Sequence, residues 1–157
     1  MDEEMKKVLA RLEAQCAKRE YCSADVLSKA VKALNGDTDR ALEVLESLEG
    51  NGYVDDLRYA SAFAREKSSL TGWGPVKIRY ALIAKKIDAE TVDSALRDTD
   101  EDNAESRLER LLQAKWKNLK GDPQAKLKLI KYALGRGYEY DDVRSAVEKT
   151  IDEDNEE

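Results

Sequence analysis

The stretch KIRYALIAKKIDAETVDSAL, residues 77–96, has the pattern of two short helices separated by a break. Ile78 and Leu82 lie four residues apart before the break, which is the spacing of one apolar helix face. Lys86 marks the break, and Asp88 follows it, where an acidic residue suits the N-cap of a second helix. The stretch therefore predicts a helix–turn–helix unit.

The same pattern occurs twice more, with a period of 51 residues, in VLSKAVKALNGDTDRALEVL (26–45) and KLKLIKYALGRGYEYDDVRSAV (126–147). A fixed period of this length is the signature of a repeat architecture. The corresponding apolar positions are Leu27, Ile78 and Leu129; Val31, Leu82 and Ala133; Ala41, Val92 and Val143; and Leu45, Leu96 and Val147. The corresponding break positions are Asn35, Lys86 and Gly137, followed by Asp37, Asp88 and Glu139.

A further helix is predicted before each pair, over residues 3–19, 55–69 and 101–119, and no segment alternates with the period of a strand. We therefore predict an all-α fold of three tandem three-helix-bundle repeats in an elongated, slightly curved arrangement, because each small unit gains from docking on its neighbour. The predicted parts are a first repeat over 1–50, a central repeat over 51–99, a third repeat over 100–150 and a disordered acidic tail over 151–157.

Charge is distributed in blocks along the chain. The net charge is −6, yet residues 58–86 hold seven basic side chains and one acidic, and residues 106–136 hold nine and two. Such blocks can place a basic stripe on an acidic protein. The alternative is that each block is simply the solvated face of a helix.

The composition excludes several classes of protein. The chain has no histidine, and Cys16 and Cys22 alone fall short of a four-ligand zinc site, so we expect reduced thiols and no metal. No apolar run is long enough to span a membrane, and the N-terminus lacks the apolar core of a signal peptide, so we expect a cytoplasmic protein.

Catalysis finds no support in the sequence. No nucleophile motif, P-loop or dinucleotide-binding pattern is present, so we expect neither an enzyme nor a cofactor. The paired carboxylates Asp55 and Asp56 precede a predicted helix, and N-capping explains them better than an active site does.

The segment 45–96 carries a family resemblance. Its features are Gly52–Tyr53, Asp55–Asp56, Arg58–Tyr59, Phe63, Arg65, the turn Gly72–Trp73–Gly74–Pro75, the pair Ile78–Arg79, and Leu82. Arg19–Glu20–Tyr21 precedes this segment, and the run from Tyr132 to Tyr138, YALGRGY, follows it. In this order the features resemble the RecX family of recombination regulators, although Lys86 stands where that family usually has a glycine.

The resemblance implies a nine-helix protein that binds the RecA recombinase filament. Members of the family reduce RecA filament growth, ATP hydrolysis and strand exchange, which limits recombinational repair and the SOS response, and some contact DNA. We accordingly expect RecA as the partner, DNA contacts within the filament or weakly alone, no membrane, and a monomer. The alternatives are a stand-alone helical DNA- or RNA-binding protein and a helical-repeat adapter for another protein.

The candidate interface combines cations of both basic blocks with two aromatic residues. Its members are Arg58, Arg65, Lys67, Trp73, Lys77, Arg79, Tyr80, Lys85, Lys86, Lys115, Lys117, Lys126 and Lys128. The helix after Pro75 has a second apolar face, formed by Val76, Tyr80 and Ile83, which either packs on a neighbouring repeat or docks on a partner. Trp73 is predicted to cover a helix junction, and Trp116 to lie in the core.

Overall fold

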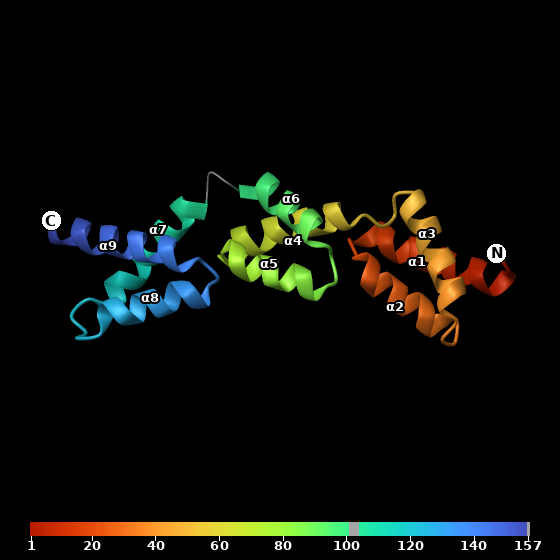
Figure 1. Ribbon diagram of the computed structural model, residues 1–157, viewed down its shortest axis with the longest axis horizontal. Coiled ribbons are helices and arrows are strands. Elements are labelled where there is room, and N and C mark those ends of the chain that lie inside the picture. Colours follow the sequence, from red (N-terminus) through yellow and green to blue (C-terminus); the bar gives the residue numbers. More distant parts are fainter. Residues whose placement is uncertain (101–103, 157) are drawn as a thin grey trace. The chain divides into compact units, whose positions relative to one another are not determined.

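A computed structural model describes residues 1–100 and 104–156, which form nine α-helices and no strand (Figure 1). The prediction of an all-α repeat protein is confirmed. The helices are α1 (Glu3–Lys18), α2 (Ser23–Ala33), α3 (Thr38–Gly50), α4 (Asp56–Leu70), α5 (Pro75–Ala84), α6 (Ala89–Asp100), α7 (Ala104–Leu119), α8 (Ala125–Gly135) and α9 (Tyr140–Glu156).

The chain divides into two compact units. The first contains residues 1–62 and 82–95, and the second contains residues 63–81 and 96–157. Each unit is described by itself below. The residue boundaries that the sequence predicts for the three repeats remain a prediction.

In the first unit, α1, α2 and α3 pack around one apolar cluster. Its fully buried members include Val26, Ala30, Val44 and Leu48. Leu27 and Val31, which the period of 51 aligns with Ile78 and Leu82, are partly buried and lie at the edge of this cluster. The fully buried positions of α2 are the preceding ones, Val26 and Ala30, which are again four residues apart.

In the second unit, α7, α8 and α9 enclose a second cluster that includes Leu112, Leu129 and Val143. Trp116 packs against this cluster, as predicted. Its indole Nε1–H also donates to Asp154 Oδ2 at 3.1 Å.

The structure corrects the prediction of a disordered tail. Residues 151–156 continue α9, because Ile151 packs on the second cluster and Asp154 is held by Trp116 and Lys120. These contacts outweigh the polar composition that suggested disorder. Residue 157 and the start of the predicted helix at 101 lie outside the described residues.

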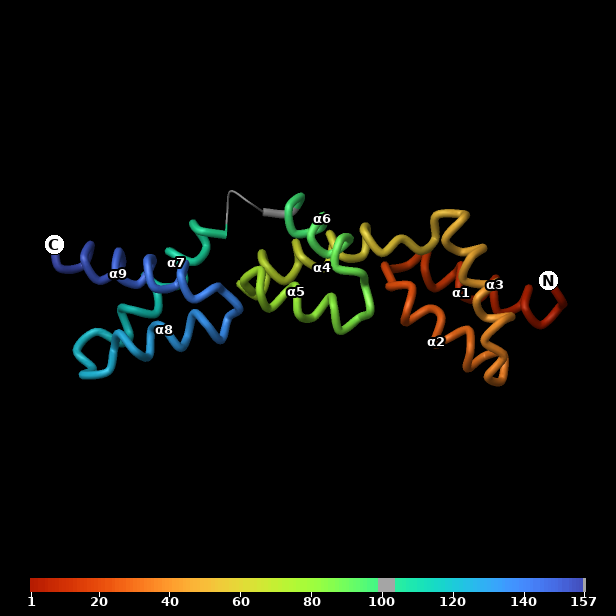
Figure 2. Tube along the Cα trace, viewed as in Figure 1, coloured from red at the N-terminus to blue at the C-terminus, as the bar shows by residue number. Residues whose placement is uncertain are grey.

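The repeat is clearest in the backbone of its turns. Asn35, Lys86 and Gly137 all have left-handed conformation, with φ of 56°, 64° and 94°. In each turn the next residue donates its N–H to the carbonyl five residues earlier: Gly36 to Val31, Ile87 to Leu82 and Tyr138 to Ala133. This is the Schellman ending of a helix. It reverses the chain between the two helices of every pair (Figure 2).

The acidic residues after the turns begin the next helices. Asp37 Oδ1 accepts from Arg40 N, and Asp88 Oδ1 accepts from Thr91 N at 2.8 Å, as N-caps do. These bonds lower the pKa of Asp88. The capping prediction therefore holds for two of the three turns.

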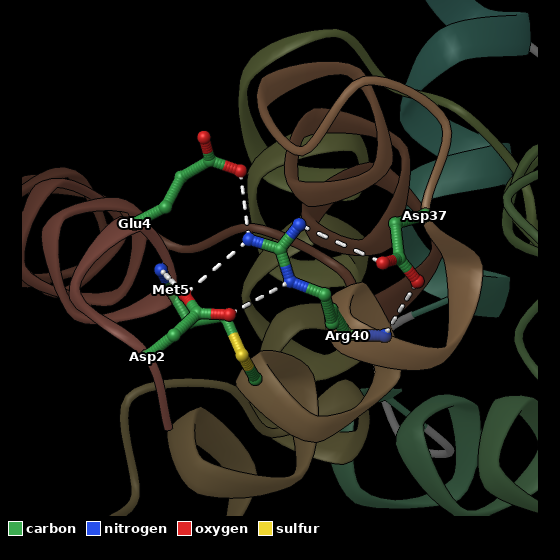
Figure 3. Close-up of polar contacts among 5 residues, drawn as sticks. All are labelled: Asp2, Glu4, Met5, Asp37 and Arg40. Atoms are coloured by element: carbon green, nitrogen blue, oxygen red, sulfur yellow. Dashed lines mark hydrogen bonds and ion pairs between the residues drawn. The ribbon is translucent and has the colours of Figure 1, made fainter.

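An ion-pair cluster ties α1 to α3 in the first unit. The guanidinium of Arg40 lies between the carboxylates of Asp2, Glu4 and Asp37, at N–O distances of 3.1, 2.7 and 3.6 Å (Figure 3). Asp2 also caps α1 by accepting from Met5 N. One side chain thus joins the N-terminal ends of two helices.

Asp55 and Asp56 are structural residues. Asp55 Oδ1 accepts from Arg58 N at 3.0 Å, which caps α4. Asp56 accepts from both the backbone N–H and the hydroxyl of Ser23, at 2.7 and 2.6 Å. The capping interpretation is confirmed for Asp55, whereas Asp56 binds the first residue of α2 instead of capping its own helix.

Lys86→Gly should stabilise the protein. A side chain in left-handed conformation costs about 1–2 kcal/mol, of which the extra chain entropy of glycine offsets about 0.4–1 kcal/mol. We expect the free energy of unfolding in urea to rise by about 0.5–1 kcal/mol. Asn35→Gly is the control and should gain less, because asparagine tolerates this conformation. An unchanged or lower stability of Lys86→Gly would contradict this account.

Candidate partner-binding surface

Two segments that lie 62 residues apart in sequence interlock in the second unit. Gly74 N–H donates to Arg136 O at 2.7 Å, and Val76 N–H donates to Gly137 O at 2.9 Å. A Cβ on Gly74 would lie 2.4 Å from Gly137 O, and a Cβ on Gly137 would lie 2.2 Å from Lys77 Cβ. The two backbones therefore approach to a distance that only glycine permits.

Tyr138 adds a side-chain contact to this junction. Its ring is buried, and its hydroxyl donates to Gly72 O at 3.3 Å. Trp73 N–H donates to Lys67 O at 3.0 Å, which ends α4. The loop before α5 is thus fixed at both ends, and the orientation of Trp73 follows from it.

Trp73 holds two cations. Its ring meets Phe63 edge to face at a centroid distance of 6.2 Å. Lys67 Nζ and Lys77 Nζ lie 4.8 and 4.6 Å from the Trp73 ring centroid. Each such cation–π contact contributes about 0.5–1 kcal/mol at an exposed site. Trp73 is half-buried, so it covers the junction as predicted and still reaches the surface.

Tyr132 holds a second pair of cations. Lys115 Nζ lies 4.9 Å and the Arg136 guanidinium carbon 5.7 Å from its ring centroid. Arg136 also approaches the Trp73 loop, since a Cβ on Gly72 would lie 3.7 Å from its Nη2. Four cations are therefore held on two aromatic rings of one unit.

A shallow apolar groove of about 420 Å³ opens beside Trp73. Trp73, Val76, Lys77, Tyr80 and Ala81 form one side of its lining; Leu134, Gly135 and Gly137 form the other. Tyr80 is 80% exposed, Val76 43% and Leu134 39%. The second apolar face of α5, which the sequence left open between two roles, is thus largely exposed to solvent.

Two of the predicted interface cations have structural partners in the first unit. Arg58 Nε donates to the carboxylate of Glu20 at 2.7 Å, and Arg58 Nη2 donates to Gly52 O at 3.0 Å. Lys85 Nζ pairs with Asp25 Oδ2 at 3.0 Å. These hydrogen bonds raise the pKa of both cations, so each is stabilised in its charged form within the fold.

The remaining predicted cations are scattered. Lys128 Nζ pairs with Asp122 at 2.6 Å, and Arg79 is half-buried. The side chains of the other four residues are exposed: Arg65, Lys86, Lys117 and Lys126. The structure therefore brings together Lys67, Trp73, Lys77 and Tyr80 in one place, and Lys115 with Arg136 in a second.

Leu134 and Arg136 were not among the predicted interface residues. Both belong to the YALGRGY segment, which the sequence offered only as a family feature. The i, i+4 spacing of Tyr132 and Arg136 is the available signal, since residues four apart on a helix face each other. Nothing in that spacing identifies the Trp73 loop as the neighbour.

The described residues can also be compared with the requirements of metal sites and membrane spans. In the part of the chain that the structure describes, no three His, Cys, Asp or Glu side chains are grouped to hold a metal ion. Cys16 and Cys22 are buried thiols, and burial raises the pKa of both. Over the same residues, none of the helices combines the length and apolar character needed to cross a membrane.

Comparison with known proteins identifies the family. Residues 55–96 match the model of the second three-helix domain of RecX, and residues 102–147 match that of the third. The chain belongs to the RecX family. Together the two RecX domains account for more than half of the chain.

Individual RecX relatives agree with this assignment. Regulatory protein RecX of Prosthecochloris aestuarii is 29% identical over 152 residues, which cover 96% of this chain and 97% of that protein. That of Clostridium botulinum (strain Eklund 17B / Type B) is 29% identical over 119 residues, and the match covers 73% of this chain and 55% of the relative's length. This chain therefore spans about half of some RecX proteins and nearly all of others.

A solved structure supports the fold. RecX from Lactobacillus salivarius superposes with a TM-score of 0.83 and covers 96% of this chain and 99% of that chain. The sequence identity is 17%, so the likeness concerns the fold alone.

Gly74→Ala tests the interlocked backbones. The added methyl group would meet backbone atoms of Gly137 at 2.4 and 2.6 Å, and such overpacking costs about 1–3 kcal/mol. We expect the free energy of unfolding in urea to fall by that amount and the fluorescence of the tryptophans to change in the folded state. Gly135→Ala is the matched control, because a Cβ there has open space around it. Equal stability of the two variants would show that the close approach does not exist in solution.

Proposed function

We propose that this protein binds the RecA filament and inhibits RecA activity: filament extension, ATP hydrolysis and strand exchange. By doing so it modulates recombinational DNA repair and the SOS response in the cytoplasm. The observation that carries the proposal is the surface of the second unit, where cations on Trp73 and Tyr132 lie beside an exposed apolar groove. Membership of the RecX family supplies the choice of RecA as the partner.

The chemistry of this surface favours regulation by binding rather than by catalysis. The groove is lined mainly by apolar side chains and glycines, with one lysine and one tyrosine, and no carboxylate or nucleophile is among its lining residues. Apolar side chains give a protein interface its buried centre, and cations around it supply register and association rate. Both features are present here within one unit.

Reversal of charge on this surface tests the proposal. Lys67→Glu, Lys77→Glu and Lys115→Glu together reverse three of the cations that lie over Trp73 and Tyr132. They should weaken inhibition of the DNA-dependent ATPase of RecA by about tenfold, since charge reversal replaces attraction by repulsion. The measurement is the ATPase rate of RecA on single-stranded DNA, titrated with the purified protein. Circular dichroism shows whether the variant remains helical.

The matched control is the triple variant Lys7→Glu, Arg11→Glu and Lys18→Glu, which makes the same change in charge at exposed positions of α1. Its inhibitory potency should stay near that of the native protein. Full potency of the first variant would remove this surface from the proposed interface. No inhibition by the native protein at a concentration equal to that of RecA would refute the proposed function itself.

The salt dependence of DNA binding distinguishes the proposed RecA regulator from a stand-alone nucleic-acid-binding protein. Four cations on one unit would suffice for phosphate contacts. Such a protein binds DNA without RecA, and its affinity falls steeply with salt in proportion to the phosphates that it neutralises. We expect weak binding to DNA alone and clear association with the RecA–DNA filament.

A further inference from the structure

We infer that the groove beside Trp73 is a docking site for an acidic peptide segment that carries a bulky apolar side chain, presented by a protein partner. The inference deepens the proposed function, since it names the chemistry that the partner brings to this surface. It depends on that function only for the identity of the partner, because the groove can be tested with a peptide alone.

The walls of the groove define the apolar part of the ligand. Val76, Ala81 and Leu134 present aliphatic surface, and Tyr80 adds an exposed aromatic ring. Apolar surface left in water is worth about 25 cal/mol per Å² when it is buried by a ligand. The volume of about 420 Å³ falls in the range of ordinary ligand sites and leaves room for an apolar side chain.

The floor of the groove is rigid. Gly135 leaves backbone exposed on one side, and the hydrogen bonds of Gly74 and Val76 fix the other side. A groove formed before the ligand arrives costs little ordering entropy on binding. This geometry suits a flexible peptide, because the peptide can adapt its conformation to a fixed site.

The rim of the groove defines the acidic part of the ligand. Lys77 lines the groove, and Lys67 stands over the same Trp73 ring. Carboxylates that flank the apolar anchor would meet these two cations, whose positions are limited by the Trp73 ring.

A nucleic-acid strand fits the groove less well. Binding of single strands uses aromatic faces on which successive bases stack. Two ammonium groups already occupy positions over Trp73, and the rest of the lining is mainly aliphatic. Tyr80 adds one exposed ring to this lining, which is not a row of faces for successive bases, whereas Val76, Ala81 and Leu134 accept an apolar side chain.

The experiment uses the full chain and a short synthetic peptide in which Asp and Glu flank a central Phe–Leu pair. Calorimetry should give a Kd on the order of 10 to 100 μM, and the peptide should shift the Trp73 indole resonance in ¹H–¹⁵N spectra, assigned with Trp73→Phe. Two comparison peptides replace Phe–Leu by Ala–Ala, or Asp and Glu by Asn and Gln. Each should bind about tenfold more weakly or worse.

The variants form a matched tyrosine pair. Tyr80→Ala removes an exposed ring of the groove and should weaken binding of the acidic peptide about tenfold. Tyr140→Ala removes an exposed ring that does not line the groove and should leave the affinity for the peptide unchanged. The inference is overturned by no binding at 1 mM peptide, by equal affinity of the two variants, or by oligo(dT) shifting Trp73 where the peptide does not.

Peptide binding and RecA inhibition can fail separately. A protein that binds the acidic peptide but does not inhibit the RecA ATPase would retain this inference and lose the proposed function. Inhibition of RecA without peptide binding would do the reverse.

Discussion

Gly137 satisfies two constraints at once, and the second unit depends on both. It is the left-handed residue that ends α8 and turns the chain into α9. It also receives the loop before α5, since its carbonyl accepts from Val76 N–H and a Cβ would lie 2.2 Å from Lys77 Cβ. Asn35 and Lys86 make the same turn with side chains present. The turn alone therefore does not require glycine here, and the close approach to Lys77 does.

This double use explains why the candidate site lies in the second unit. The same turn occurs three times in the described part of the chain. In its third copy, the backbone carbonyl of Arg136 accepts a hydrogen bond from Gly74 N–H. The contact places Trp73 near Leu134 and Arg136, which come from a later helix pair. The third copy of this turn thus also contributes residues to the lining of the groove.

The helices and turns could be predicted from the sequence because their causes are local. Apolar spacing, the Asp N-caps and the positions of Asn35, Lys86 and Gly137 all act within a few residues. The site could be predicted only in part. The sequence predicts Arg58 and Lys85 as interface cations but does not indicate their ion-pair partners, Glu20 and Asp25, which lie 38 and 60 residues away. The prediction of a disordered tail was wrong for the same reason, since Asp154 is bound by Trp116, which lies 38 residues away.

The two apolar faces of α5 differ in their burial. Ile78 and Leu82 are 2% and 0% exposed, and these residues satisfy the helix's need for a core. Val76 and Tyr80 lie on the opposite side and stay in water, beside Leu134. Scattered exposed apolar residues need no explanation, but a contiguous group on a rigid groove with cations at its rim does. Burial by a partner would remove that surface from water, and the cations would select which partner approaches.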